Sequence, residues 1–430
     1  MKLIAAPLSL GQLYIFRGIE RHPKDQLHNI GVTYNLDHTW RVPDGVAVTR
    51  ILSAFAGLVE RNEVLRTTYD GIGNRSRQAC QIIHRAPPIE LPVLSFTGGD
   101  GKGRAAEVAE EFCIRAMDLG EQFSWRAALI VVDGRPSHIA LCFHHIGVDL
   151  AAISLLREDF QRLLEGRPGP VRPGPREIAE YQGSDKWRRR SERVDRYFSE
   201  VWRQSARWEA IPLEGEGAWQ WMATLKTGLT PGTLQRRASE HGLSISSLLM
   251  GVFTRALARA GSLIQPTIQL MSANRFDPAL KWAAANLGQF VPVLHRTDPT
   301  ERLGVHCRRL YRETLIAFRN GCYDIDRVRS LRDEAYGGWP DDDPVIYFNY
   351  AEGDSRRHAD DDLEVARLSW GSVRIAVEPG FYGYVWGGTQ VSLILRSFWP
   401  RFDRPQVEAV IRDMHAELVR VIVSDHELDA

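Results

Sequence analysis

Residues 139–149, Ile-Ala-Leu-Cys-Phe-His-His-Ile-Gly-Val-Asp, decide the fold, because an apolar strand here gives way to a helix over 150–164. Five apolar residues in succession predict a buried strand, and the apolar spacing after Asp149 predicts a helix. An aspartate at a helix start can cap free backbone N–H groups or pair with an arginine. The segment therefore predicts a strand, a polar loop and a helix, with two histidines where the strand ends.

His144 and His145 are adjacent, so at a strand end their side chains point to opposite sides. One imidazole can then face a cleft while the other packs inward. A cleft-facing imidazole, with an ordinary pKa of about 6.5, can remove a proton from an amine or hydroxyl nucleophile. The short pattern HHxxxD also fits a polar corner without catalysis, and spacing alone leaves both interpretations open.

A proline- and glycine-rich segment, GRPGPVRPGP, begins at Gly166. Its prolines exclude a helix interior and a central strand, so it predicts the main division of the chain. We expect an N-terminal lobe over 1–165, a linker over 166–176 and a C-terminal lobe over 177–430. In the first lobe the patterns predict helices over 44–62, 104–117 and 150–164, with Asp44 as an N-cap, and a hairpin of 125–133 and 137–143 turning at Asp133-Gly134.

The C-terminal part mixes predicted helices with predicted strands. Helices are expected over 177–208, 232–240, 244–260, 300–319 and 405–423. Strands are expected around Trp219 and Trp221 and over 267–272, 289–294, 344–350, 372–378 and 389–397. Helices and strands in both parts place the chain in the α/β class, as a mixed α+β fold.

The composition excludes several classes of protein. With 54 basic and 54 acidic residues the net charge is zero, so the electrostatic footprint of a nucleic-acid-binding protein is missing. No apolar run approaches the roughly 20 residues of a membrane-spanning helix. The five cysteines are odd in number and include no CxxC pair, which argues against a zinc site or a disulfide framework and favours a reducing cytosol. Asp341-Asp-Asp343 lies between prolines and indicates a loop rather than a metal site, so we expect no bound metal. From the cysteines we expect a cytoplasmic protein.

Further motifs lie in order along nearly the whole chain. They are Pro7-Leu8-Ser9 with Gln12, Arg61–Thr67, Met117-Asp118-Leu119 with Trp125, His144–Asp149, Tyr181 with Trp187, Met271–Arg275, Asn286–Pro292 and Phe348-Asn349-Tyr350. Together they resemble the condensation domains of nonribosomal peptide synthetases, within the wider chloramphenicol-acetyltransferase-like superfamily. The ordered set is far more specific than any one of its members.

The resemblance implies two chloramphenicol-acetyltransferase-like lobes in a V-shaped arrangement with a central substrate tunnel. It implies that His145 deprotonates or orients the attacking nucleophile, while His144 is structural. Asp149 would pair with Arg275 and tie the motif loop to the second lobe. The tunnel or acceptor pocket would include Gly147, Asn349, Tyr384 and Trp386.

The resemblance also implies the reaction and its partners. A carrier protein would bring an acyl or aminoacyl group as a phosphopantetheine thioester, and an amine or alcohol would accept it to form an amide or ester in natural-product biosynthesis. The chain itself would bind no cofactor. We expect a freestanding condensation enzyme, since no adenylation or carrier segment fits within 430 residues, and a monomer is the simplest state.

The sequence departs from the family pattern at several positions. Leu150 stands where a glycine usually follows the motif aspartate, so the backbone there must accept a side chain. Asn62, Gly183 and Pro292 replace a histidine, an acidic residue and an asparagine. These changes weaken any transfer of substrate preference, although the fold should tolerate them.

Two other functions remain open from the sequence. One is a noncatalytic recruitment module that keeps the fold and binds partner synthetase proteins, which Leu150 favours slightly and the intact histidine pair opposes. The other is a coenzyme A-dependent acyltransferase of the same superfamily, whose motif usually needs only HxxxD. The basic run Lys186–Arg190 fits a solvated helix face, or a surface that receives an acidic carrier protein.

Overall fold

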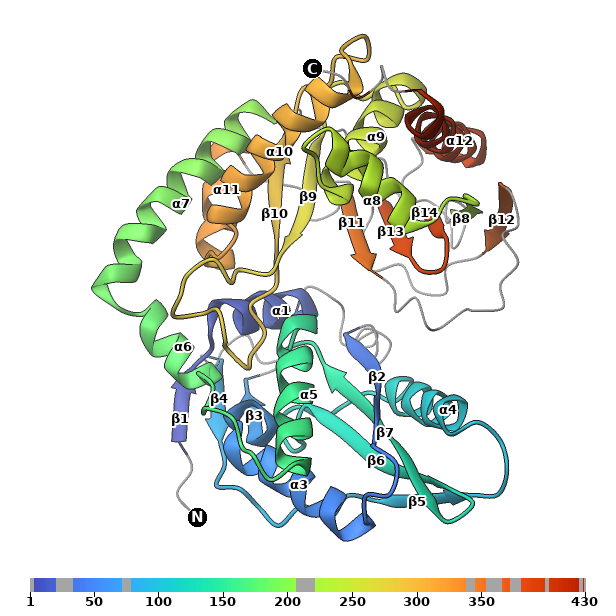
Figure 1. The fold of residues 1–430 in the computed structure, drawn as a ribbon. Helices are drawn as coiled ribbons and strands as arrows, with labels where there is room; N and C mark the ends of the chain where they lie inside the picture. Colours follow the sequence, from blue (N-terminus) through green and yellow to red (C-terminus); the bar gives the residue numbers. More distant parts are fainter. Residues whose placement is uncertain are drawn as a thin grey trace. The chain divides into compact units, whose positions relative to one another are not determined.

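The computed structural model describes residues 4–20, 34–71, 79–205, 221–337, 345–352, 366–371, 380–398 and 402–424, together with Leu428. The chain forms two compact units. The first contains Met1–Arg193, Ala273–Gln289 and Cys322–Arg327, and the second contains the remaining residues. The first unit therefore extends past the predicted linker and includes two segments that we expected in the C-terminal lobe. Both units combine helices with sheets, as predicted (Figure 1).

The central element of the first unit is the predicted hairpin, formed by β6 (Trp125–Val132) and β7 (Arg135–His144). Between the strands, Asp133 and Gly134 have φ values of 48° and 76°, the left-handed values that a two-residue hairpin turn needs. β2 (Asn35–Arg41) and β5 (Val93–Phe96) extend the hairpin to a sheet with the order β2-β7-β6-β5. A second sheet has the order β1-β4-β3, from β1 (Ile4–Pro7), β3 (Thr67–Asp70) and β4 (Cys80–Ile83).

Helices cover both faces of the four-stranded sheet, because its side chains alternate between two cores. α3 (Val48–Arg61) and α5 (Leu150–Leu164) contribute to the core that buries Phe143. α4 (Gly101–Cys113) packs on the opposite face, in the core that buries Ala140. Burying both faces fixes β7, and with it the end of the strand where the histidine pair lies.

Two helix starts differ from the predictions. α4 begins at Gly101 rather than Arg104, because the Asp100 side chain accepts hydrogen bonds from the first free backbone N–H groups. Asp44 is not an N-cap, since α3 begins at Val48 without a side-chain cap. The helix α5 has the predicted bounds, with the Asp149 carboxylate as its cap.

The single helix predicted over 177–208 is wrong. Two helices occupy this region, α6 (Pro175–Gln182) and α7 (Asp185–Gln204), with a break at Gly183 and Ser184. The Ser184 hydroxyl donates to the Tyr181 carbonyl, so the chain turns locally instead of continuing one helix. A further helix of the first unit, α1 (Leu10–Glu20), was not predicted.

The second unit is built on one seven-stranded sheet with the order β10-β9-β11-β13-β14-β8-β12. Its strands are β8 (Trp221–Lys226), β9 (Thr267–Ser272), β10 (Gln289–Leu294), β11 (Val345–Glu352), β12 (Arg367–Gly371), β13 (Gly380–Gly387) and β14 (Val391–Ser397). β9, β11 and β13 are parallel, while β13, β14, β8 and β12 are antiparallel neighbours. The strand predicted over 372–378 lies outside the described residues, as does Trp219, and β12 and β13 were not predicted.

The second unit contains the helices α8 (Pro231–Glu240), α9 (Ile245–Ala260), α10 (Leu303–Arg319) and α12 (Arg404–Val423), most of α11 (Ile325–Tyr336) and the C-terminal half of α7. Most residues of α9 are buried, and its Phe253 ring stacks on Phe381 of β13. Gly383 makes room for this ring, since a Cβ there would lie 2.5 Å from it. Within the described part of the chain, no helix is both long and apolar enough to span a membrane.

Candidate active site

The histidine motif begins at His144, the last residue of β7, and continues through the loop that leads to α5 (Figure 1). Backbone hydrogen bonds hold this loop on several sides. The His145 N–H donates to the Tyr34 carbonyl at 2.8 Å, and the Gly147 carbonyl accepts from the Asn286 N–H at 2.7 Å. Segments far apart in the sequence thus position the five residues that follow β7.

His144 faces inward and is 1% exposed. Its Nδ1 accepts a hydrogen bond from the Ile146 N–H at 3.1 Å, so the neutral ring carries its proton on Nε2. Burial, with a smaller contribution from the neighbouring His145, lowers the pKa of His144 to about 3. The ring is therefore neutral at physiological pH and borders a pocket of about 260 Å³ that also contains Tyr69 and Met117.

His145 differs from its neighbour because the residue as a whole is partly exposed. Its Nδ1 is buried, which leaves Nε2 as the nitrogen for a substrate. Burial lowers the pKa of His145 below its ordinary value, and the nearby Asp149 charge opposes this shift without reversing it. A neutral imidazole at pH 7 is the form that can accept a proton.

Asp149 and Arg275 form a two-pronged ion pair. Nη1 of Arg275 donates to Oδ2 of Asp149 at 2.7 Å, and Nη2 donates to Oδ1 at 2.9 Å. The carboxylate also accepts from the backbone N–H groups of Ala152 and Leu287. The pair therefore joins the start of α5 to the segment Ala273–Gln289. That segment belongs to the first compact unit, so the predicted pair lies within one unit, although Arg275 falls in the stretch that we expected to form the C-terminal lobe.

Asn286 is a supporting residue whose role the sequence reasoning missed. It is fully buried, and its side chain donates to the Gly11 carbonyl at 3.0 Å while accepting from the Gly288 N–H. A Cβ at Gly11 would lie 2.2 Å from the Asn286 carbonyl oxygen, so the two segments touch through backbone atoms. Asn286 is the first residue of the motif Asn286–Pro292, and this position in a family motif is the sequence signal that indicates a supporting role.

The four residues predicted to line the tunnel or acceptor pocket fall into two places. Gly147 is buried in the first unit, and a Cβ there would lie 2.6 Å from the Ser124 hydroxyl. Asn349, Tyr384 and Trp386 come together in the second unit, where Asn349 pairs with Tyr384 across β11 and β13. These three side chains are partly exposed, and the Tyr384 and Trp386 rings stack at 6.4 Å. Their role as an acceptor pocket stays a prediction.

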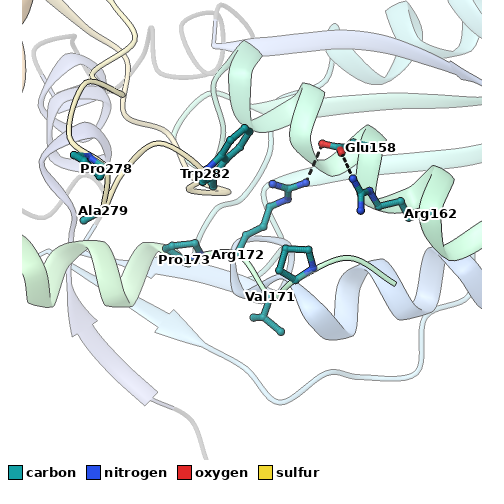
Figure 2. A pocket seen from close by; sticks show the side chains of 9 residues that line it. Glu158, Arg162, Val171, Arg172, Pro173, Pro278, Ala279 and Trp282 are labelled. Atoms are coloured by element: carbon teal, nitrogen blue, oxygen red, sulfur yellow. Dashed lines mark hydrogen bonds and ion pairs between the residues drawn. The ribbon is translucent and has the colours of Figure 1, made fainter. Parts of the chain in front are cut away.

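A second pocket of the first unit, of about 350 Å³, was not predicted. Figure 2 shows Arg172 of the proline-rich segment extending toward Glu158 of α5, with Trp282 nearby. Arg172 also forms a two-pronged pair with the buried Asp159 at 2.7 and 2.8 Å. The proline-rich segment thus packs on α5 by a buried ion pair, which its sequence did not indicate.

In the described part of the chain, no group of three or more histidine, cysteine or acidic side chains could hold a metal ion. Asp341-Asp-Asp343 lies outside that part. Leu150 is 59% exposed at the first turn of α5 and is not among the residues with positive φ, so its backbone accepts a side chain as the fold requires.

A family model, the condensation domain, matches residues 12–361 of this chain. The chain belongs to the condensation-domain family. Known structures agree with the fold: the condensation domain that mediates chain release from the enacyloxin polyketide synthase has a TM-score of 0.74, with 16% identity over 98% of this chain and 84% of that one. The condensation domain of the Monacolin K polyketide synthase MokA has a TM-score of 0.73, with 15% identity over 99% of both chains. The mixed helix and sheet fold is chloramphenicol-acetyltransferase-like.

Curated relatives of this condensation domain are much longer proteins. Tyrocidine synthase 3 of Brevibacillus parabrevis is 30% identical over 34% of this chain and 2% of its own length. The beauvericin nonribosomal cyclodepsipeptide synthetase BEA1 of Gibberella fujikuroi is 24% identical over 71% of this chain and 10% of its own length. The chain therefore spans a tenth or less of these two relatives.

Proposed function

We propose that this condensation domain joins an acyl or aminoacyl group, carried as a thioester on a carrier protein, to an amine or alcohol. The observation that carries the proposal is the Asp149–Arg275 pair, because it fixes the loop that presents a neutral, partly exposed His145. Family membership supports the reaction class.

His145 is proposed to act on the nucleophile. Its Nε2 accepts the proton of the amine or alcohol while the nitrogen or oxygen attacks the thioester carbonyl carbon. The C–S bond then breaks, and the carrier thiol leaves with a proton returned from the imidazole. His144 does not exchange protons in this scheme, because burial keeps its ring neutral and its Nδ1 accepts from the backbone.

The partners follow from this chemistry. The donor arrives on the phosphopantetheine arm of a carrier protein, and the chain supplies no cofactor of its own. Both amines and alcohols are proposed as acceptors, since one matching relative is named as a cyclodepsipeptide synthetase.

The test is turnover of an acyl-carrier protein by the purified chain with a panel of amines and alcohols. We expect product with wild type and a loss of about 100-fold or more for His145→Ala. His138→Ala is the matched control, because His138 lies in the same strand six positions before His144. The acid limb of the wild-type pH profile should lie below about pH 6.5, since the pKa of His145 is lowered.

Equal turnover by wild type and His145→Ala would overturn the catalytic role. The same assay separates the other functions. Turnover of the acyl group on coenzyme A but not on the carrier protein would indicate a coenzyme A-dependent acyltransferase. Binding of partner proteins without turnover of any thioester would indicate a recruitment module.

A further inference from the structure

Two cysteines meet beside the histidine strand. Cys113 is the last residue of α4, and Cys142 lies in β7 two positions before His144. Both are free thiols, and their sulfur atoms are 2.8 Å apart. We propose that Cys113 and Cys142 form a reversible disulfide under mild oxidation, an inference independent of the proposed function.

The end of α4 is held in place above Cys142 by side chains from the sheet. Arg126 lies directly opposite Cys142 in the β6–β7 register. Its guanidinium donates to the carbonyls of Phe112, Arg115 and Ala116 at 2.7 to 2.9 Å. From β2, Asn35 donates to the Cys113 carbonyl itself at 2.9 Å. These bonds fix the backbone on both sides of Cys113, so the two thiols stay close without a covalent link.

The two thiols differ in access, which gives them different roles. Cys113 is partly exposed, so a small oxidant can reach it. Cys142 is fully buried, and contact with Cys113 together with burial raises the pKa of its thiol. A reachable cysteine beside a second, resolving cysteine is the arrangement typical of reversible thiol oxidation.

The proposed oxidant is a hydroperoxide. The Cys113 thiol loses its proton, the thiolate attacks the peroxide oxygen, and the O–O bond breaks to give a sulfenic acid and hydroxide, which takes up that proton to form one water. The Cys142 sulfur then attacks the sulfenic sulfur, the S–S bond forms, the S–O bond breaks, and a second water leaves with the thiol proton. Two thiols lose two electrons and hydrogen peroxide is reduced to two waters. A dithiol reverses the reaction by exchange.

The experiment treats the full chain with a small excess of hydrogen peroxide, followed by alkylation under denaturing conditions and mass spectrometry. We expect the intact mass to fall by two hydrogen atoms and two of the five thiols to resist alkylation. Peptide mapping should find Cys113 linked to Cys142, and dithiothreitol should restore all thiols. The oxidised form should also melt at a higher temperature, because the link closes the chain between the two cysteines into a loop.

Variants separate this pair from the other cysteines. Cys113→Ser should abolish the mass loss, while Cys80→Ser, at another partly exposed cysteine, should leave it unchanged. Cys113 lies at a helix end, so its serine variant tests the pair even if Cys142→Ser fails to fold. A sulfinic or sulfonic acid at Cys113 without a cross-link would overturn the proposal. So would a link that persists in Cys113→Ser, or five thiols that all remain reactive.

Discussion

Asp149 is the residue that holds the histidine loop in place, through the hydrogen bonds of its carboxylate. It caps α5, accepts two hydrogen bonds from Arg275 and accepts one more from the backbone of Leu287. Both side chains are mostly buried, with 13% exposure for Arg275 and 10% for Asp149. A buried pair of this kind says little about net stability, but removing one partner leaves an uncompensated charge.

Arg275→Ala should therefore lower the free energy of unfolding by about 3–5 kcal/mol. Arg275→Lys should recover part of the loss, since a lysine keeps the charge but not the two-pronged geometry. The measurement is urea unfolding followed by circular dichroism. Arg115→Ala is the control, because Arg115 pairs with Glu111 on the surface with 63% of its side chain exposed, and its loss should stay below about 1 kcal/mol. A loss for Arg275→Ala no larger than the control would contradict the role of the pair.

His144 should make the protein less stable in acid. Its pKa is about 3 in the folded protein, and the ordinary value is about 6.5. Between these values the unfolded chain binds the proton and the folded chain does not, so stability rises with pH and is lost as the pH falls. The slope from this site is about 1.4 kcal/mol per pH unit.

The measurement is the free energy of unfolding of wild type and His144→Gln between pH 6.5 and pH 4.5. We expect a smaller fall for the variant, whatever its stability at pH 7, because glutamine does not titrate. Equal slopes for the two proteins would show that His144 is not held neutral by burial.

At the scale of elements, Gly147 in the loop after β7 lies against Ser124, the residue that precedes β6. A Cβ at Gly147 would lie 2.6 Å from the Ser124 hydroxyl but at ordinary distances of 3.5 and 3.6 Å from Val64 and the Ser124 Cβ. Only one atom therefore prevents a side chain at Gly147. The contact between Gly147 and Ser124 can therefore be tested by substituting both residues.

Gly147→Ala should lower stability by about 1–3 kcal/mol through overpacking, and should reduce turnover by shifting the His145 loop. Ser124→Ala removes the crowded hydroxyl and should itself cost about 1 kcal/mol. The double variant should recover much of the Gly147→Ala loss, measured as a double-mutant cycle. Additive losses would mean that the two residues do not touch.

Local signals predicted some elements well and others poorly. α5, β9 and β10 have the expected bounds, because apolar spacing and a cap or turn residue agree there. β13 was missed, since its glycines and aromatic residues carry no plain strand pattern, and packing against α9 makes it a strand. The break between α6 and α7 was missed because a short polar turn at Ser184 interrupts an otherwise helical pattern.

At the scale of the molecule, the first unit is not a continuous piece of chain. One of its cores joins Ile178 and Trp187 to Leu280, Leu287 and Cys322, which come from later segments. These residues bury one another, so the N-terminal part alone would expose apolar side chains to water.

A fragment of residues 1–193 should therefore unfold at a lower denaturant concentration than the full chain, or fail to fold. Circular dichroism and urea unfolding measure this, with the full chain as the control. Adding a peptide of residues 273–289 should raise the midpoint of a folded fragment, because it restores Arg275, Leu280 and Leu287. An isolated fragment as stable as the full chain would contradict the division into units described above.

The sequence by itself determined the α/β class, the hairpin, the helix α5 and the order of motifs that leads to the family, because each depends on neighbouring residues. It also paired Asp149 with Arg275, through the resemblance. Only the tertiary structure decided which unit holds Arg275, what the proline-rich segment packs against, and that Cys113 meets Cys142. Those contacts join residues far apart in the chain, and no local pattern reports the distance between them.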